Sequence, residues 1–187
     1  MLYPFDALFK AVPAVLLAVW LINTNVQSKT IAVAGLVFCA SGDILLALTF
    51  QDNFVFGLLA FLVAHLLFAL YFLKFHDWHI QKLPVMGLGI ISMLGAALFI
   101  LPETSKMFWP VSAYMFVIVT MAIMAILAAK NNPALIVGVF MFMFSDLLIG
   151  VNRFVFAIPL EHLVIMLTYY SALYLIVTGI RKQFTAI

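Results

Sequence analysis

Long apolar runs follow one another along almost the whole chain, separated by short stretches in which polar, charged and proline residues gather. Each run has about 20 residues, the length that an α-helix needs to cross a hydrocarbon layer about 30 Å thick. The runs are apolar all round, whereas the strands of an outer-membrane barrel alternate apolar and polar residues, so the pattern favours helices. It predicts seven spans, at residues 4–22, 30–50, 53–73, 83–101, 108–129, 133–151 and 159–180.

The composition places the chain in a membrane. Of 187 residues, 67% are apolar and 9% are charged, whereas an ordinary soluble domain has about 25% charged residues. Seven spans and their short connections leave no room for a soluble domain, so we expect one integral membrane domain, residues 1–187, folded as an all-α polytopic helical bundle. A formal net charge of +2 excludes a basic nucleic-acid binder, and a single cysteine excludes an internal disulfide.

Lysine and arginine divide unevenly between the two ends of the predicted spans. The end with more positive charge is expected to face the cytoplasm, which places the C-terminus in the cytoplasm, as in a bacterial inner-membrane protein. The first span has polar residues inside it and no cleavage signature after it, so we expect it to be retained. The richer end carries Lys29, Lys74, Lys82, Lys130, Arg181 and Lys182, and the other end carries Lys10, Lys106 and Arg153.

Two carboxylates lie deep inside predicted spans. Asp43 follows a glycine in the second span, and Asp146 follows a serine in the sixth. Both are about 13 residues from the start of spans that cross in the same direction, so a rise of 1.5 Å per residue puts them at one depth, about 20 Å in. A carboxylate there costs about 2.5–3.5 kcal/mol unless it has a partner, water or a proton. Two acids sharing a cavity would leave one protonated and one ionised, which is an acid/base pair.

The same two acids allow other interpretations. They can form hydrogen bonds that hold neighbouring helices together, with no catalytic role. They can also bind protons or cations in a carrier, because buried acids are how many carriers hold their ions. No spacing of histidine, cysteine or acidic residues matches a strong metal signature, so we expect no metal and no cofactor.

Three polar residues deep in other spans are candidates to support the acids. His65 lies in the middle of the third span, and Tyr169 and Tyr170 lie in the middle of the seventh. A buried imidazole or phenol needs a hydrogen-bond partner, and one of the tyrosines can orient an aspartate. Ordinary packing with an interhelical hydrogen bond is the alternative for all three.

Further candidates lie near the membrane edge. Arg153 comes two turns after Asp146 and can bind a phosphate with its guanidinium, with Asn152 beside it as a further donor. The alternative to phosphate binding is that Arg153 only extends its guanidinium from an apolar helix to the polar interface. His162 follows Glu161 near the start of the seventh span, where both can support the acids or simply be hydrated.

A short match hints at an internal repeat. The sequence Asn-Phe-Val-Phe at 53–56 resembles Arg-Phe-Val-Phe at 153–156, and each is followed by a span containing a histidine. This predicts two parallel repeats.

Taken in order, several of these residues resemble the YhhN/TMEM86 family of membrane proteins, whose characterised members are lysoplasmalogenases. The resemblance extends over essentially the whole chain, and the Gly-Asp and Ser-Asp pairs are its most specific part. Family members usually have about eight spans, and this chain has Phe68 and Leu173 where tyrosine and glutamine are common. The matching set is Lys10, Pro13, Gly42, Asp43, Leu45, Leu46, Gly57, Phe61, His65, Tyr114, Phe144, Ser145, Asp146, Asn152, Arg153, Phe154, Tyr169 and Tyr170.

The resemblance implies cleavage of the vinyl ether bond of lysoplasmenyl-ethanolamine or lysoplasmenyl-choline, giving a fatty aldehyde and a glycerophospho-ethanolamine or glycerophosphocholine. The lysophospholipid would enter from the membrane. Vinyl ether hydrolysis needs one acid and one base, and we assign these roles jointly to the two aspartates. Arg153, Asn152 or Lys10 would hold the phosphate, and His65 and the two mid-span tyrosines would orient the acids. A proton- or cation-coupled carrier using the same aspartates remains the alternative.

Overall fold

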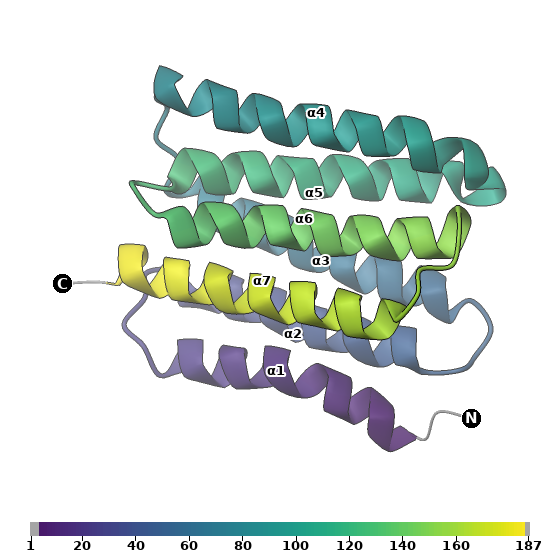
Figure 1. Ribbon diagram of the computed structural model, residues 1–187. Helices are drawn as coiled ribbons and strands as arrows, with labels where there is room; N and C mark the ends of the chain where they lie inside the picture. The colour runs from purple at the N-terminus through teal and green to yellow at the C-terminus, as the bar shows by residue number, and fades with distance from the viewer. Residues whose placement is uncertain (1–3, 186–187) are drawn as a thin grey trace.

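The structure is a computed structural model that describes residues 4–185, except for the side chains of residues 4–7. The described chain runs back and forth along one axis as a bundle of helices (Figure 1). The helices are α1 (Pro4–Ile22), α2 (Lys29–Ala47), α3 (Asn53–Leu73), α4 (Leu83–Ile100), α5 (Phe108–Ala128), α6 (Pro133–Phe154) and α7 (Glu161–Phe184).

The helices have the length and composition of membrane spans. Six of them are long and apolar enough to cross a membrane, and α1 adds a shorter apolar stretch, Leu8–Ile22. In the described residues the strand content is limited to one isolated bridge between Val26 and Thr185. The all-α polytopic bundle predicted from the hydropathy pattern is therefore confirmed, and the protein is a multi-pass integral membrane protein.

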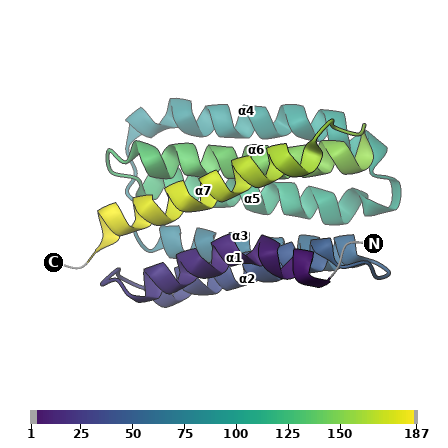
Figure 2. The same cartoon turned by 60° about the horizontal axis from the view of Figure 1, so that its bottom comes forward.

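The helices form two neighbouring groups (Figure 2). One group is α1, α2 and α3, and the other is α4, α5 and α6, while α7 packs against α6 and α1. A contact between α3 and α5 joins the groups in the middle. Because the helices alternate in direction, α2 and α6 run the same way and the two termini lie at opposite ends of the bundle (Figure 1).

Several predicted boundaries were wrong by a few residues. The second helix ends at Ala47 instead of residue 50, because Leu48 is extended. The largest error is four residues at the end of the last helix, which continues to Phe184. Both boundaries of the sixth connection were also wrong: α6 continues to Phe154, and α7 begins only after Leu160, a residue in the left-handed conformation with φ 54°. The proline at 159 resembled a helix start, but the backbone N–H of Ile158 donates to the side chain of the residue at 152 and holds this stretch as a loop.

The short match that suggested an internal repeat was wrong. Asn53 begins α3, whereas Arg153 lies in the last turn of α6, so the segments 53–56 and 153–156 occupy different places in the fold. Each aspartate instead lies in the first helix of a hairpin, α2 with α3 or α6 with α7.

Glycines allow close packing within both hairpins. A Cβ on Gly35 of α2 would lie 3.1 Å from the ring of Phe68 of α3, and a Cβ on Gly138 of α6 would lie 2.9 Å from the backbone nitrogen of Ile176 of α7. Gly138 comes 103 residues after Gly35, and the two buried aspartates are separated by the same 103 residues. Each aspartate therefore lies eight residues after a glycine at which two helices pack closely.

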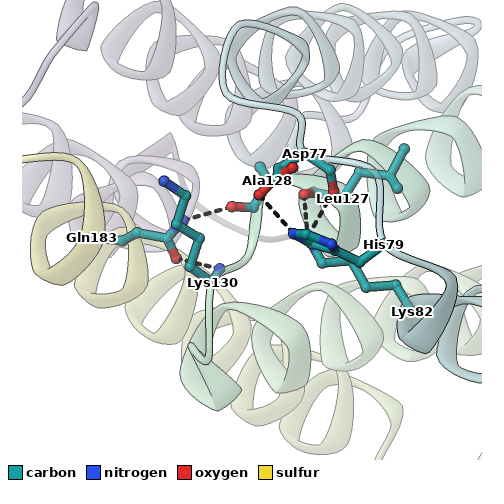
Figure 3. A network of polar contacts seen from close by, with 7 residues as sticks. All are labelled: Asp77, His79, Lys82, Leu127, Ala128, Lys130 and Gln183. Atoms are coloured by element: carbon teal, nitrogen blue, oxygen red, sulfur yellow. Dashed lines mark hydrogen bonds and ion pairs between the residues drawn. The ribbon is translucent and has the colours of Figure 1, made fainter.

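Polar side chains tie the helices together at the end of the bundle opposite the N-terminus (Figure 3). The ammonium of Lys82 donates to the carbonyl of Leu127 at 2.6 Å. Gln183 donates to the carbonyl of Ala128 at 2.6 Å and accepts from the backbone N–H of Lys130 at 3.1 Å. Because these contacts satisfy carbonyls at the end of α5 that have no helical partner, they join α4, α5, α6 and α7 at this end.

Candidate active site

A phenol and an imidazole contact the same oxygen atom of one aspartate. The hydroxyl of Tyr114 on α5 donates to Oδ2 of Asp146 on α6 at 2.5 Å. Nε2 of His65 on α3 lies 3.3 Å from the same oxygen, and the two side chains are 1% and 6% exposed. Side chains of α3, α5 and α6 therefore meet at one buried carboxyl.

The two ring nitrogens of His65 have different surroundings. Its Nδ1 lies 2.6 Å from the carbonyl oxygen of Phe61, which can only accept, so the hydrogen is assigned to Nδ1. Nε2 is buried, lies 3.3 Å from Oδ2 of Asp146 and has no hydrogen-bond partner in residues 4–185. His65 and Asp146 are therefore close neighbours at the site, and the lone pair of Nε2 is unpartnered.

The second aspartate contacts a tyrosine of α7. Asp43 is 8% exposed, and its Oδ2 accepts a hydrogen bond from Tyr169 on α7 at 3.1 Å. The next residue, Tyr170, donates instead to the backbone carbonyl of Lys10 on α1 at 2.8 Å. The adjacent phenols therefore tie α7 to α2 and to α1, and only the first of them orients an acid.

Both aspartates line one polar cavity of about 230 Å³. The cavity lies between α1, α2, α3, α6 and α7, near the end of the bundle where the chain begins. Of the residues singled out from the sequence, only His65 is outside the lining, because it is buried behind Asp146. The other polar lining residues are Lys10, Asn152, Arg153, Glu161, His162, Tyr169 and Tyr170.

The residues at the mouth of this cavity form different contacts with their neighbours. Asn152 uses its Oδ1 to accept from the backbone N–H of Ile158 at 2.8 Å, which orders the α6–α7 loop. The guanidinium of Arg153 lies over the ring of Phe54, 5.0 Å from its centroid. His162 is 70% exposed and contacts the carboxylate of the preceding glutamate at 3.5 Å. Asn152 therefore orders the loop at the mouth, while the guanidinium of Arg153 donates no hydrogen bond to the described residues.

A narrow apolar pocket of about 50 Å³ adjoins the polar cavity. It lies between α3, α4, α5 and α6 and is lined by aliphatic and aromatic side chains, with Tyr114 and Asp146 as its polar members. The residues that line both the pocket and the cavity are Leu46, Phe54, Phe61, Asp146 and Ile149.

Small residues beside each aspartate allow the helices to approach at the site. A Cβ on Gly42 would lie 2.6 Å from the ring of Phe61, so only glycine lets α3 pack this closely against α2. At the equivalent position of α6, Ser145 is buried and its hydroxyl donates to the carbonyl of Ile165 at 3.3 Å. In the described part of the chain, no three histidine, cysteine or acidic side chains gather as a metal site.

Comparison with known proteins decides the family. The sequence model described as the YhhN family matches residues 5–180. The chain belongs to the YhhN family.

Curated relatives of this YhhN protein share about a third of its residues. "Lysoplasmalogenase TMEM86A" of Bos taurus is 30% identical, over 91% of this chain and 76% of the relative. "Lysoplasmalogenase TMEM86B" of Mus musculus is 29% identical, over 95% and 76%. The "Lysoplasmalogenase" of Mycobacterium tuberculosis is 33% identical, over 91% and 68%. No solved structure gives a significant match.

One residue of the site in this YhhN protein had no role in the sequence analysis. Tyr114 belonged to the set that resembles the family, yet nothing in its neighbourhood indicated which acid it would meet. A signal was present, because a phenol in the middle of an apolar span must find an acceptor. The partner became visible only with the packing of α5 against α6.

Proposed function

We propose that this protein is an intramembrane hydrolase that cleaves the vinyl ether bond of lysoplasmalogens. The products are a fatty aldehyde and a glycerophospho-ethanolamine or glycerophosphocholine. The names of the curated relatives support this substrate. The observation that carries the proposal is that the polar cavity and the apolar pocket meet at Asp146. A lysoplasmalogen has one apolar chain and one polar headgroup, and the bond to be cleaved lies where they join.

The two spaces suggest how the lipid is held. The alkenyl chain enters the apolar pocket from the membrane, and the phosphate lies in the polar cavity with Arg153 and Lys10. Arg153 comes seven residues after Asp146 on α6, which corresponds to about 10 Å along the helix axis. A glycerophosphate unit, together with the reach of the arginine side chain, spans this separation. The vinyl ether is then placed beside Asp146.

The reaction begins with transfer of a proton from Asp146. The proton of this carboxyl, which lies 3.3 Å from Nε2 of His65, goes to the vinyl carbon distal to the ether oxygen, and the electrons of the double bond form the new C–H bond. The carbon next to the oxygen becomes an oxocarbenium ion. Tyr114, which donates to the same carboxylate oxygen, stabilises the negative charge that appears there.

Asp43 completes the reaction from the polar side. Oriented by Tyr169, it accepts a proton from water as the water oxygen bonds to the oxocarbenium carbon, and a hemiacetal forms. The hemiacetal collapses when its ether oxygen takes up a proton and its hydroxyl loses one. The C–O bond breaks and gives the aldehyde and the glycerol hydroxyl. One water molecule is consumed, and both carboxyl groups return to their starting state.

The arrangement of the two ends of the bundle favours a hydrolase over a carrier. The polar cavity is lined by residues from one end of the helices. At the other end, Lys82 and Gln183 join the helices through backbone carbonyls. A carrier needs access from both sides of the membrane. With the C-terminus in the cytoplasm of a bacterial cell, as the distribution of lysine and arginine predicts, the cavity opens toward the outer face of the inner membrane.

The proposal is tested by measuring aldehyde release from lysoplasmenyl-ethanolamine by detergent-purified protein. We expect one aldehyde for each glycerophospho-ethanolamine formed, and no release from the 1-acyl lysophospholipid with the same headgroup, which has no vinyl ether. A protein that is folded by thermal unfolding and releases no aldehyde would contradict the proposed substrate. Proton flux in liposomes would then test the carrier.

Replacing Tyr114 by phenylalanine tests the role of its hydroxyl. We expect kcat to fall about tenfold, because one hydrogen bond to a charged group contributes about 1.5–3 kcal/mol, while the ring keeps its edge contact with His65. The matched control is Tyr71→Phe, which removes a buried hydroxyl that has no partner within residues 4–185. An equal loss in both variants would show that Tyr114 acts through packing alone.

A further inference from the structure

The mouth of the polar cavity carries charges of both signs. Glu161 is the first residue of α7, and its side chain lines the cavity together with the cations Lys10 and Arg153. The carboxylate is 32% exposed, so it is reachable from the cavity while being partly shielded. It is also distinct from Asp43 and Asp146, each of which accepts a hydrogen bond from a buried tyrosine.

The opposite charges at the mouth do not pair with each other. Among the described residues, Glu161 contacts His162 at 3.5 Å, and Arg153 forms no ion pair. Its guanidinium instead lies on the ring of Phe54. The loop between them is ordered by the hydrogen bond that the backbone N–H of Ile158 donates to the side chain of Asn152. A cation and an anion are therefore held apart at the mouth of one cavity, which suits a zwitterionic ligand placed between them.

We propose that Glu161 binds the primary ammonium of an ethanolamine headgroup while Arg153 binds its phosphate. The site then selects lysoplasmenyl-ethanolamine over the choline lipid and over a headgroup without an amine. This assignment rests on the proposed function and specifies its substrate.

Hydrogen bonding explains the preference for a primary ammonium. An ethanolamine ammonium has three N–H donors for the carboxylate of Glu161, whereas a choline nitrogen has none. Proteins that bind quaternary ammonium use the faces of aromatic rings instead. The nearby face of Phe54 is already covered by the guanidinium of Arg153 at 5.0 Å. Choline is left with weaker electrostatic attraction to one carboxylate.

A headgroup without an amine is disfavoured for a second reason. The phosphate of alkenyl-glycerophosphate carries more negative charge than that of a diester, and it would lie in a cavity that already contains Glu161. No positive group of the ligand would offset this repulsion. Neutralising the glutamate should therefore raise kcat/KM for this lipid and lower it for the ethanolamine lipid.

The test compares kcat/KM of the wild type and Glu161→Gln for three lipids with the same alkenyl chain. The lipids carry phosphoethanolamine, phosphocholine or phosphate alone. We expect the variant to lose about tenfold on the ethanolamine lipid, mostly through KM, to stay within about twofold on the choline lipid, and to gain on the phosphate lipid. The matched control is Glu103→Gln, an exposed carboxylate of the α4–α5 connection outside the cavity lining, which should change none of the three.

Binding of saturated ether analogues separates this assignment from the proposed function. These lipids have the same three headgroups and no cleavable bond, so their affinity for the purified protein does not depend on turnover. We expect the ethanolamine analogue to bind best to the wild type and to lose this advantage in Glu161→Gln. Equal changes for all headgroups, or an unchanged preference, would overturn the role of Glu161. Absent aldehyde release with the binding preference intact would overturn the vinyl ether hydrolase alone.

Discussion

Replacing Asp146 by asparagine should lower aldehyde release about 10³-fold and leave the bundle folded. The amide has the same shape, and a nitrogen in the place of Oδ2 can donate one N–H to Nε2 of His65 and the other to the hydroxyl oxygen of Tyr114, so both neighbours have a partner. It has no acidic proton for the vinyl carbon, and general acid catalysis contributes about 10²–10⁴-fold. The measurement is single-turnover aldehyde release in detergent, with the unfolding temperature recorded for each protein.

Asp52→Asn is the matched control for this substitution. Asp52 is an exposed carboxylate in the α2–α3 connection with φ 62°, a conformation that asparagine also adopts readily. We expect wild-type release from this control. If Asp146→Asn also retained wild-type release, the aspartate would be a hydrogen-bonding group between helices and the acid would lie elsewhere.

Replacing Asp43 by asparagine should lower kcat about 10²- to 10³-fold with little change in KM. The amide oxygen can still accept the hydrogen bond from Tyr169, which in the wild type is 3.1 Å from the carboxylate. It cannot take a proton from water, so the oxocarbenium ion is trapped slowly. Because the phosphate and chain contacts are unaffected, substrate binding should persist.

Steady-state kinetics distinguish this expectation from a packing role of Asp43. A loss confined to kcat, together with partial recovery when formate supplies a small external base, fits a general base in a cavity of about 230 Å³. A proportional rise in KM, or a fall in the unfolding temperature that accounts for the lost activity, would assign Asp43 to the packing of α2 against α7.

The depth of the two acids could be predicted from sequence, whereas their partners could not. A fixed rise per residue and an odd number of intervening crossings place Asp43 and Asp146 at one level, and both line one cavity. Which helices are neighbours depends on how complete side-chain surfaces pack. The meeting of Tyr114 and His65 on one carboxyl required the contacts of α3 and α5 with each other and with α6.

Element boundaries were predictable where proline or polar residues interrupt an apolar run. The prediction failed at the α6–α7 connection, where the side chain of Asn152 accepts a hydrogen bond from the backbone N–H of Ile158 and determines the loop. The internal repeat shows the same limit. Three matching residues of four at 53–56 and 153–156 suggested it, whereas these segments lie at the start of α3 and at the end of α6.

The α4 helix matters for the two acids although it packs loosely. It is the least buried of the six candidate spans. The crossings of α3, α4 and α5 separate α2 from α6, so these two helices run in the same direction. Without the crossing of α4, α6 would run opposite to α2, and its aspartate would be counted from the other face of the membrane. The α4 helix therefore brings Asp146 to the level of Asp43, and a chain without it would carry its two acids at different depths.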